Sequence, residues 1–355
     1  MQQSKQTTQT YSQEIDNENT LKMRELLEDL PRFCRQYFRG IAPTTGSRTR
    51  LAYAYDLRLF FEYMHDNNSE LHKIDIPHFS LSVLEQIQKE DIEEFLEWTT
   101  YYTKNGKIYT NDEKGKSRKL SAIRSMYHYF FQAELIEKDV SLLVPMPKQH
   151  EKPIIRLEPD EVAKLLDQVE DGEGLTKSEM KYHDKTKTRD VALITLLLGT
   201  GIRVSECVGL DLNDLNFDEC GMKVHRKGGY DAIVYFGDEV EKALLDYLEE
   251  RKQIVPQKGS ENALFLSMQN RRITVRAVEK LVKKYASRVT TLKKITPHKL
   301  RSTYGTNLYR ETGDIYLVAD VLGHKDVNTT KKHYAAIEED RRRSAANIVK
   351  LREDE

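Results

Sequence analysis

Four prolines interrupt the chain between Val144 and Pro159, where they stand among charged residues. Proline lacks a backbone N–H and its ring clashes with the preceding helical turn, so this stretch cannot form a long helix and is expected to be an extended linker. At 355 residues the chain is also longer than one average domain. The sequence therefore predicts a flexible N-terminus at residues 1–20, a first domain at 21–144, a linker at 145–158 and a second domain at 159–355.

Apolar residues before the linker recur with the period of a helix. One such face begins near Ser47, and similar patterns cover Glu90 to Tyr101 and Ser117 to Glu134. Basic residues lie beside or just before these faces, namely Arg48, Arg50, Lys116, Arg118 and Lys119. One interpretation is a helical bundle with charged outer faces, and the other is a bundle that places these basic side chains on phosphates.

The second domain mixes helices with a small sheet. Helices are expected at Pro159–Gln168 and Arg189–Leu198, with a polar loop between them at Gly172–Lys187. Two short strands, at 222–225 and 231–236, flank a glycine pair that supplies the positive φ angles of a tight turn. The predicted fold class is mainly α with a small β-hairpin, so that the second domain is α+β.

The net charge of -1 conceals an uneven distribution of charge. Twelve lysines and arginines lie between Arg271 and Arg310, against the single acid Glu279. A split of this kind suits a protein that binds a polyanion on one face. Arg271, Arg272 and Arg276 are therefore candidate nucleic-acid contacts, and the alternative is a solvated basic helix.

Composition limits the compartment and the chemistry. The polar N-terminus lacks the apolar segment of a secretion signal, and no apolar run approaches the roughly 18 residues of a membrane span. We expect a cytoplasmic protein without membrane association. Three cysteines without a C-x-x-C pair predict neither a disulfide framework nor a zinc site.

Six chemically active side chains are spread through the second domain: Arg203, Lys227, His298, Arg301, His324 and Tyr334. Two arginines, a lysine, two histidines and a tyrosine form a set able to hold a phosphodiester and to attack it without a metal. Each also has an ordinary structural explanation. These are an ion pair of Arg203 with Glu206 or Asp214, a solvated turn for Lys227, a surface position for His298 and Arg301, a helix cap for His324 and a core position for Tyr334.

His298 and Arg301 are three residues apart and would share one face of a helix. Thr296 is a favourable N-cap and Pro297 suits the first helical position. The pair would then lie in an opening turn, where backbone N–H groups attract anions. A phosphate could meet a guanidinium, an imidazole and a helix N-terminus together.

The combined motifs resemble the tyrosine recombinases of the lambda-integrase and Xer superfamily over essentially the whole chain. The resemblance is carried by L-G-T-G-I-R-V-S-E at 198–206, K-G-G at 227–229, H-K-L-R at 298–301, L-G-H-K-D at 322–326 and T-T-K-K-H-Y at 329–334. The sequence is most similar to the Xer recombinases that act as a single protein. Tyr334 lies ten residues after His324, one more than is common in the family.

The resemblance implies a two-domain DNA clamp, with a helical, SAM-like core-binding domain at 21–144 and a catalytic domain at 159–355 that ends in a tail helix. It implies that Tyr334 attacks the phosphodiester, that Arg203 and Arg301 hold its oxygens and that Lys227 protonates the leaving group. His298 would act as general base, and His324 would donate a hydrogen bond to the phosphate. No cofactor and no metal are expected, because the covalent link preserves the phosphoester energy.

The implied partner is double-stranded DNA, bound at two sites by a homotetramer, with a DNA-translocating ATPase as a possible regulator. The short polar segment 1–20 is unlike an arm-binding domain, which favours chromosome-dimer resolution at a dif-like site over integration or excision of a mobile element. A type IB topoisomerase shares the phosphotyrosyl chemistry, and a DNA-binding protein without catalysis would not need the complete residue set.

Overall fold

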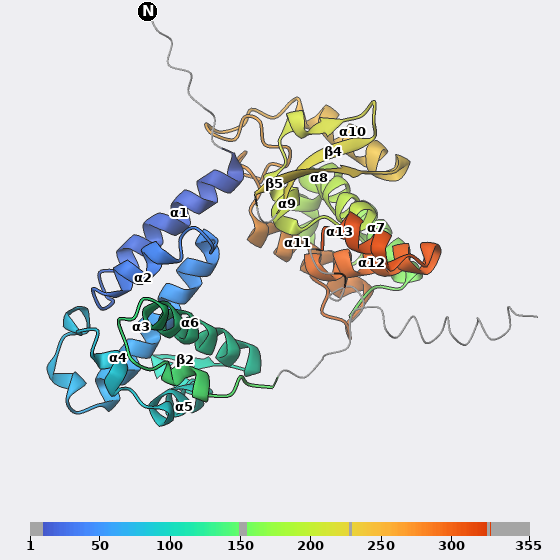
Figure 1. Cartoon of the computed structure of the whole chain (residues 1–355). Coiled ribbons are helices and arrows are strands. Elements are labelled where there is room, and N and C mark those ends of the chain that lie inside the picture. The colour runs from blue at the N-terminus through green and yellow to red at the C-terminus, as the bar shows by residue number, and fades with distance from the viewer. Residues whose placement is uncertain (1–9, 149–154, 227–228, 325–326, 328–355) are drawn as a thin grey trace, which may run out of the picture. The chain divides into compact units, whose positions relative to one another are not determined.

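The computed structural model describes residues 10–148, 155–226, 229–324 and 327. Contacts divide the chain into two compact units, Met1–Lys152 and Pro153–Glu355. Both units are largely helical and each contains a small antiparallel sheet, which confirms the predicted mainly α fold class (Figure 1). Lys227, Tyr334 and the expected tail helix lie outside the described residues.

The N-terminal unit is a helical bundle with one hairpin. Its main elements are α1 (Tyr11–Leu26), α2 (Cys34–Gly40), α3 (Ser47–Asn67), α4 (Val83–Gln86), α5 (Lys89–Trp98), β1 (Tyr101–Lys104), β2 (Lys107–Thr110) and α6 (Glu113–Gln132). Helix α3 packs against α1 and α6. Its apolar face buries Phe60 and Phe61. The ring of Phe60 packs edge-on against the ring of Phe95, with 5.2 Å between the ring centroids.

The predicted helix over Glu90–Tyr101 is wrong at its end, because α5 stops at Trp98 and Tyr101 begins a strand. Asn105 and Gly106 have φ angles of 50° and 71°, as a two-residue hairpin turn requires. Tyr102 stacks on Trp98 at 4.5 Å between ring centroids, which fastens the hairpin to the end of α5.

The C-terminal unit surrounds the long helix α8. Its main elements are α7 (Pro159–Asp171), α8 (Lys177–Thr200), α9 (Val204–Gly209), β3 (Leu215–Asn216), β4 (Gly221–Arg226), β5 (Tyr230–Tyr235), α10 (Asp238–Arg251), α11 (Val275–Val289), α12 (Pro297–Thr312) and α13 (Ile315–Leu322). Helix α8 packs against α7, α10 and α12 (Figure 1). The strands pair antiparallel in the order β3-β4-β5. All three cysteines are free thiols.

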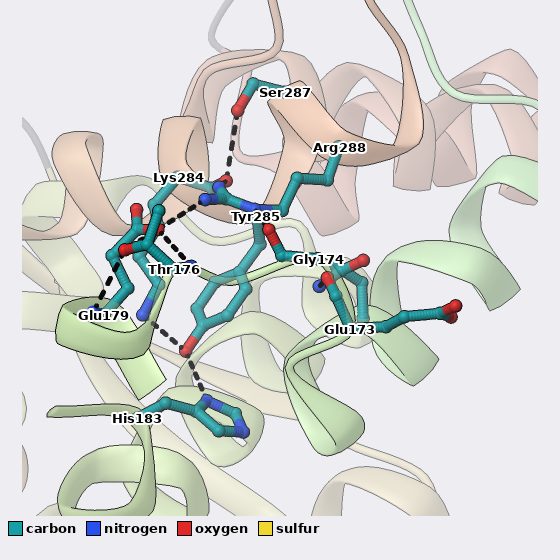
Figure 2. Close-up of polar contacts among 10 residues, drawn as sticks. Glu173, Gly174, Thr176, Glu179, His183, Lys284, Tyr285, Ser287 and Arg288 are labelled. Atoms are coloured by element: carbon teal, nitrogen blue, oxygen red, sulfur yellow. Dashed lines mark hydrogen bonds and ion pairs between the residues drawn. The ribbon is translucent and has the colours of Figure 1, made fainter. Parts of the chain in front are cut away.

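The predicted loop at Gly172–Lys187 is also wrong, because α8 begins at Lys177. Thr176 and Glu179 form a capping box, in which the threonine side chain accepts from the backbone N–H of Glu179 and the glutamate accepts from that of Thr176. The inward face of this first half is polar, and its His183 bonds to the hydroxyl of Tyr285 on α11 (Figure 2). A charged exterior and a polar interior hid the helix from hydrophobic periodicity.

Candidate catalytic site

Arg203 is the N-cap residue of α9, two residues after Gly201 ends α8. Its backbone N–H and its Nη1 donate to the two carboxylate oxygens of Glu206 at 2.8 and 2.7 Å. The Glu206 side chain is 3% exposed, so the pair is fixed from the inside of the unit. The ion pair considered from the sequence is therefore present. It orients the arginine, because Nη2 is left to donate to the carbonyl of Gly323 at 3.2 Å.

Arg301 lies in the second turn of α12 and is buried. Its Nη1 donates to the carbonyl of Gly201 at 2.6 Å, and its Nη2 donates to the carbonyl of Leu322. His298 is exposed in the first turn of the same helix. Thr296 and Pro297 occupy the expected N-cap and first position, although the threonine side chain makes no capping hydrogen bond.

The end of α13 gathers three guanidinium groups. Carbonyls in the last turn of a helix have no partner within the helix. Here those of residues 321–323 each accept from one arginine, in order Arg226, Arg301 and Arg203. Such carbonyls carry partial negative charge and favour cations. Of these three arginines, Arg203 also pairs with a carboxylate, that of Glu206.

His324 follows directly after α13. Gly323 caps the helix with φ +62°, and the backbone N–H of His324 donates to the carbonyl of Ala319 at 2.9 Å. The side chain of His324 is half-buried. The fold thus brings Arg203, Arg301 and His324 to one helix end, although they are spread over more than a hundred residues of sequence.

Arg226 belongs to this group and was not selected from the sequence. It is the last residue of β4, is 5% exposed and donates from Nη2 to the carbonyl of Val321 at 2.9 Å. A signal for it existed, because alternate residues of a strand face the same side. Arg226 shares its side with Met222 and Val224, both buried.

The three predicted nucleic-acid contacts of this unit differ in environment. Arg276 on α11 is exposed, and Arg271 is exposed with its Nε bonded to Gln257 at 2.6 Å. Arg272 instead donates to the carbonyls of Val208 and Leu210 at 3.0 and 2.9 Å and pairs with Asp211. Its side chain, 15% exposed, holds two loops together.

The five predicted nucleic-acid contacts of the N-terminal unit also differ in how exposed they are. Arg48 is exposed on the first turn of α3, and Arg50 and Lys116 are half-buried. Arg118 is half-exposed and pairs with Asp56. Lys119 lies in the interior, where its ammonium donates to Asn111 Oδ1 at 2.8 Å and lies 3.7 Å from Asp56.

Burial shifts the pKa values of Asp56 and Lys119. It raises the pKa of Asp56 to about 6, although Arg118 and Lys119 act in the opposite direction. Burial likewise lowers the pKa of Lys119. Both shifts follow from the cost of holding charge away from water. In this conformation Lys119 contributes to the interior of the unit and presents no exposed ammonium.

One group in the described part of the chain has the residue types of a metal site: His65, Asp66 and His72. His65 Nδ1 is bonded to Asp66 at 2.9 Å, and His72 Nδ1 lies 3.2 Å from the carbonyl of His65. The two imidazole rings are tilted by 41°, with centroids 4.8 Å apart. The group belongs to the N-terminal unit and includes none of the residues at the end of α13. Within the residues described, no helix has the length and apolar character to cross a membrane.

Comparison with known proteins places the chain in a family. Residues 155–341 match the Phage integrase family. Tyrosine recombinase XerC of Caldanaerobacter subterraneus subsp. tengcongensis is 31% identical over 345 residues, which cover 94% of this chain and 89% of the relative. Tyrosine recombinase XerS of Streptococcus agalactiae is 31% identical over 339 residues, with 87% of this chain and 93% of the relative covered.

A solved structure of XerH site-specific recombinase bound to palindromic difH substrate, in a post-cleavage complex, has a TM-score of 0.66 at 20% identity. The match covers 93% of this chain and 89% of that one, and at this identity it concerns the fold. The resemblance to Xer recombinases, XerS among them, is confirmed. This chain belongs to the phage integrase family and is a site-specific tyrosine recombinase, an enzyme that cleaves and rejoins DNA.

Proposed function

We propose that this recombinase exchanges strands between two DNA duplexes through a 3′-phosphotyrosyl intermediate. The Tyr334 phenol oxygen forms a bond to the phosphorus, the bond from phosphorus to the 5′ oxygen breaks, and that oxygen takes up a proton. The 5′-hydroxyl of the second duplex then attacks the phosphotyrosyl bond and releases the tyrosine. Because one phosphoester replaces another, the exchange needs no energy source.

The observation that carries this proposal is the meeting of Arg203, Arg301 and His324 at the end of α13. The two arginines hold the non-bridging oxygens, where negative charge grows in the transition state. They are suited to this because their positions are fixed before DNA binds, by Glu206 and by the carbonyls of Gly201 and residues 322–323. His324 donates a hydrogen bond to the same phosphate.

Proton transfers are assigned to three other residues. A tyrosine hydroxyl has a pKa near 10 and becomes a good nucleophile only when a base accepts its proton. His298, exposed three residues before Arg301, acts as that base. Lys227 acts as the general acid toward the 5′ oxygen. Tyr334 and Lys227 both lie outside the described residues, and their roles rest on the sequence.

The biological substrate we propose is a dif-like chromosomal site, at which the enzyme resolves chromosome dimers during cell division. A homotetramer would hold two duplexes and pass through a Holliday junction, under control of a DNA-translocating ATPase. Support comes from the relatives named XerC, XerD and XerS and from a structural neighbour solved with difH. Integration or excision of a mobile element is the alternative within the family.

A nicked duplex that loses its 5′-hydroxyl fragment after cleavage tests the chemistry, because the covalent adduct cannot religate. The wild-type protein should form an adduct that survives denaturing electrophoresis. Tyr334→Phe should form none, whereas the matched control Tyr316→Phe should form it normally, since Tyr316 is 64% exposed on α13 and lies before His324. An adduct that persists in Tyr334→Phe overturns the nucleophile.

Two intact duplexes test the biology. Joined products and a four-way intermediate from dif-like DNA support strand exchange at such a site. Products obtained only from the ends of a mobile element favour the integrase alternative. Relaxation of supercoiled plasmid by a monomer, without exchange, favours a type IB topoisomerase.

A further inference from the structure

Within the residues that the structure describes, Arg226 is a buried cation for which no carboxylate partner is found. Its side chain is 5% exposed, and its one hydrogen bond in the described part of the chain runs from Nη2 to the carbonyl of Val321 at 2.9 Å. Its Nε and Nη1 are buried and have no hydrogen-bond partner among the described residues. A buried polar group that is left unbonded costs about 1 to 3 kcal/mol, and more when it is charged. The position is therefore poorly explained by stability alone.

The arginine lies directly against Gly323. A Cβ at position 323 would stand 1.6 Å from Nη1 and 2.5 Å from Cζ of Arg226, so the guanidinium would have to move to make room for it. The glycine is also in the left-handed region, at φ +62°. Gly323 immediately precedes His324, so the guanidinium supports the backbone that positions the histidine.

The same arginine ends β4 and is one peptide bond from Lys227. Consecutive Cα atoms are held about 3.8 Å apart. Arg226 pairs across the hairpin with Tyr230, the last pair before the turn. Its side chain thus connects the end of this hairpin to the helix end that Arg203 and Arg301 also bind.

We propose that Arg226 is a positioning residue, which fixes the lysine-bearing end of the β4–β5 hairpin to the phosphate-binding end of α13. This inference rests on the proposed function, in which Lys227 protonates the leaving 5′ oxygen. In this role Arg226 acts through the position of the hairpin end and not as a group that reacts. Arg226 fixes the hairpin end that bears the general acid relative to the arginines that hold the phosphate.

The test compares two nicked substrates that differ in one atom. In the first the leaving group is the natural 5′ oxygen, and in the second it is a bridging sulfur. A thiolate is a good leaving group without being protonated, so cleavage of the sulfur substrate does not need a general acid. A residue that positions the acid affects the oxygen substrate selectively, whereas a residue needed only for folding affects both.

Arg226→Met removes the charge and the hydrogen bond but retains a long side chain. We expect the rate of adduct formation on the oxygen substrate to fall at least about tenfold, a modest part of what general acids contribute. On the sulfur substrate the rate should stay within about threefold of wild type, because the acid is no longer needed.

Arg251→Met is the matched control. Arg251 is also 5% exposed, and its guanidinium donates to the backbone carbonyls of Glu261 and Ala263 at 3.0 and 3.1 Å. It lies on α10 and not at the end of α13. Any loss in this variant should be equal on the two substrates. Arg226→Lys retains the cation and keeps the test valid if the methionine variant misfolds. It should also lose more rate on the oxygen substrate than on the sulfur substrate, but to a smaller degree.

Equal losses on both substrates in Arg226→Met and Arg226→Lys overturn the inference, as does an unchanged rate on the oxygen substrate. Lys227→Ala should itself recover on the sulfur substrate. If it does not, or if the wild-type protein forms no adduct, the failure lies in the proposed function and not in the role of Arg226.

Discussion

Removal of one buried hydroxyl, in Tyr285→Phe, should destabilise the C-terminal unit and leave the N-terminal unit unchanged. The ring of Tyr285 is fully buried on α11. Its hydroxyl donates to Asp190 Oδ2 at 3.0 Å and accepts from Lys284 Nζ at 2.9 Å. It also lies 3.0 Å from Nδ1 of His183 (Figure 2).

The protonation of this group follows from its surroundings. Burial and Asp190 together raise the pKa of Tyr285 well above its usual range, so the phenol retains its proton. Since that proton goes to Asp190, the hydroxyl can only accept from His183, and the histidine must donate from Nδ1. Phenylalanine would therefore leave a buried imidazole N–H without an acceptor.

The cost can be worked from these contacts. A buried donor without a partner costs about 1 to 3 kcal/mol. Asp190 keeps Thr186 and Arg189 as donors, so its loss is smaller. The ring itself still fills its space. We expect the free energy of unfolding to fall by about 2 to 3 kcal/mol, which at ordinary urea dependences shifts the midpoint by about 1 M.

Urea unfolding followed by two probes measures this effect with an internal control. Trp98, the single tryptophan, lies on α5 in the N-terminal unit, so its fluorescence reports that unit. Circular dichroism at 222 nm reports both units. The variant should move the dichroism transition of the C-terminal unit to lower urea, and the fluorescence transition of the N-terminal unit should not change. An unchanged dichroism curve, or an equal shift in the fluorescence curve, refutes the reasoning.

Four further substitutions have defined outcomes. Gly323→Ala should reduce adduct formation by at least about tenfold, because the left-handed backbone and Arg226 exclude a Cβ, and normal cleavage would contradict this geometry. Asp56→Asn should flatten the pH dependence of the Trp98 transition. The pKa of Asp56 is raised to about 6, so the folded state holds its proton more tightly and wild-type stability should fall as the pH rises from about 4 to 6; equal slopes in the two proteins would contradict this. Arg276→Gln should lower the salt dependence of duplex binding by about one ion without changing urea stability, whereas Arg272→Met should lower stability by about 2 kcal/mol, and the reverse pattern would reject this division.

The sequence predicted best where one residue type has one structural use. Thr296 with Pro297 predicted the start of α12. Apolar spacing located α3 and α6 to within a few residues. In each case the signal is local, because it depends on backbone geometry or on a face of one helix.

Prediction failed where tertiary contacts replace the expected pattern. The first half of α8 buries His183 and Thr186, which form hydrogen bonds to Tyr285 and to Asp190 in place of apolar packing. No hydrophobic period marks such a helix. The hairpin at Tyr101–Thr110 was different, because Asn105-Gly106 is a local turn signal that was present and could have been used.

The way in which the arginines are held has a consequence for binding an anion. If carboxylates held all three arginines, the positive charge of the arginines would be neutralised, and a phosphate would compete with each carboxylate for its arginine. Instead, backbone carbonyls of residues 321–323 accept hydrogen bonds from all three arginines, and Glu206 pairs with Arg203. A carbonyl orients a guanidinium without cancelling its charge, so the helix end presents fixed donors that remain cationic. Sequence alone cannot reveal this, because a carbonyl is common to every residue, and only the fold decides which three face the arginines.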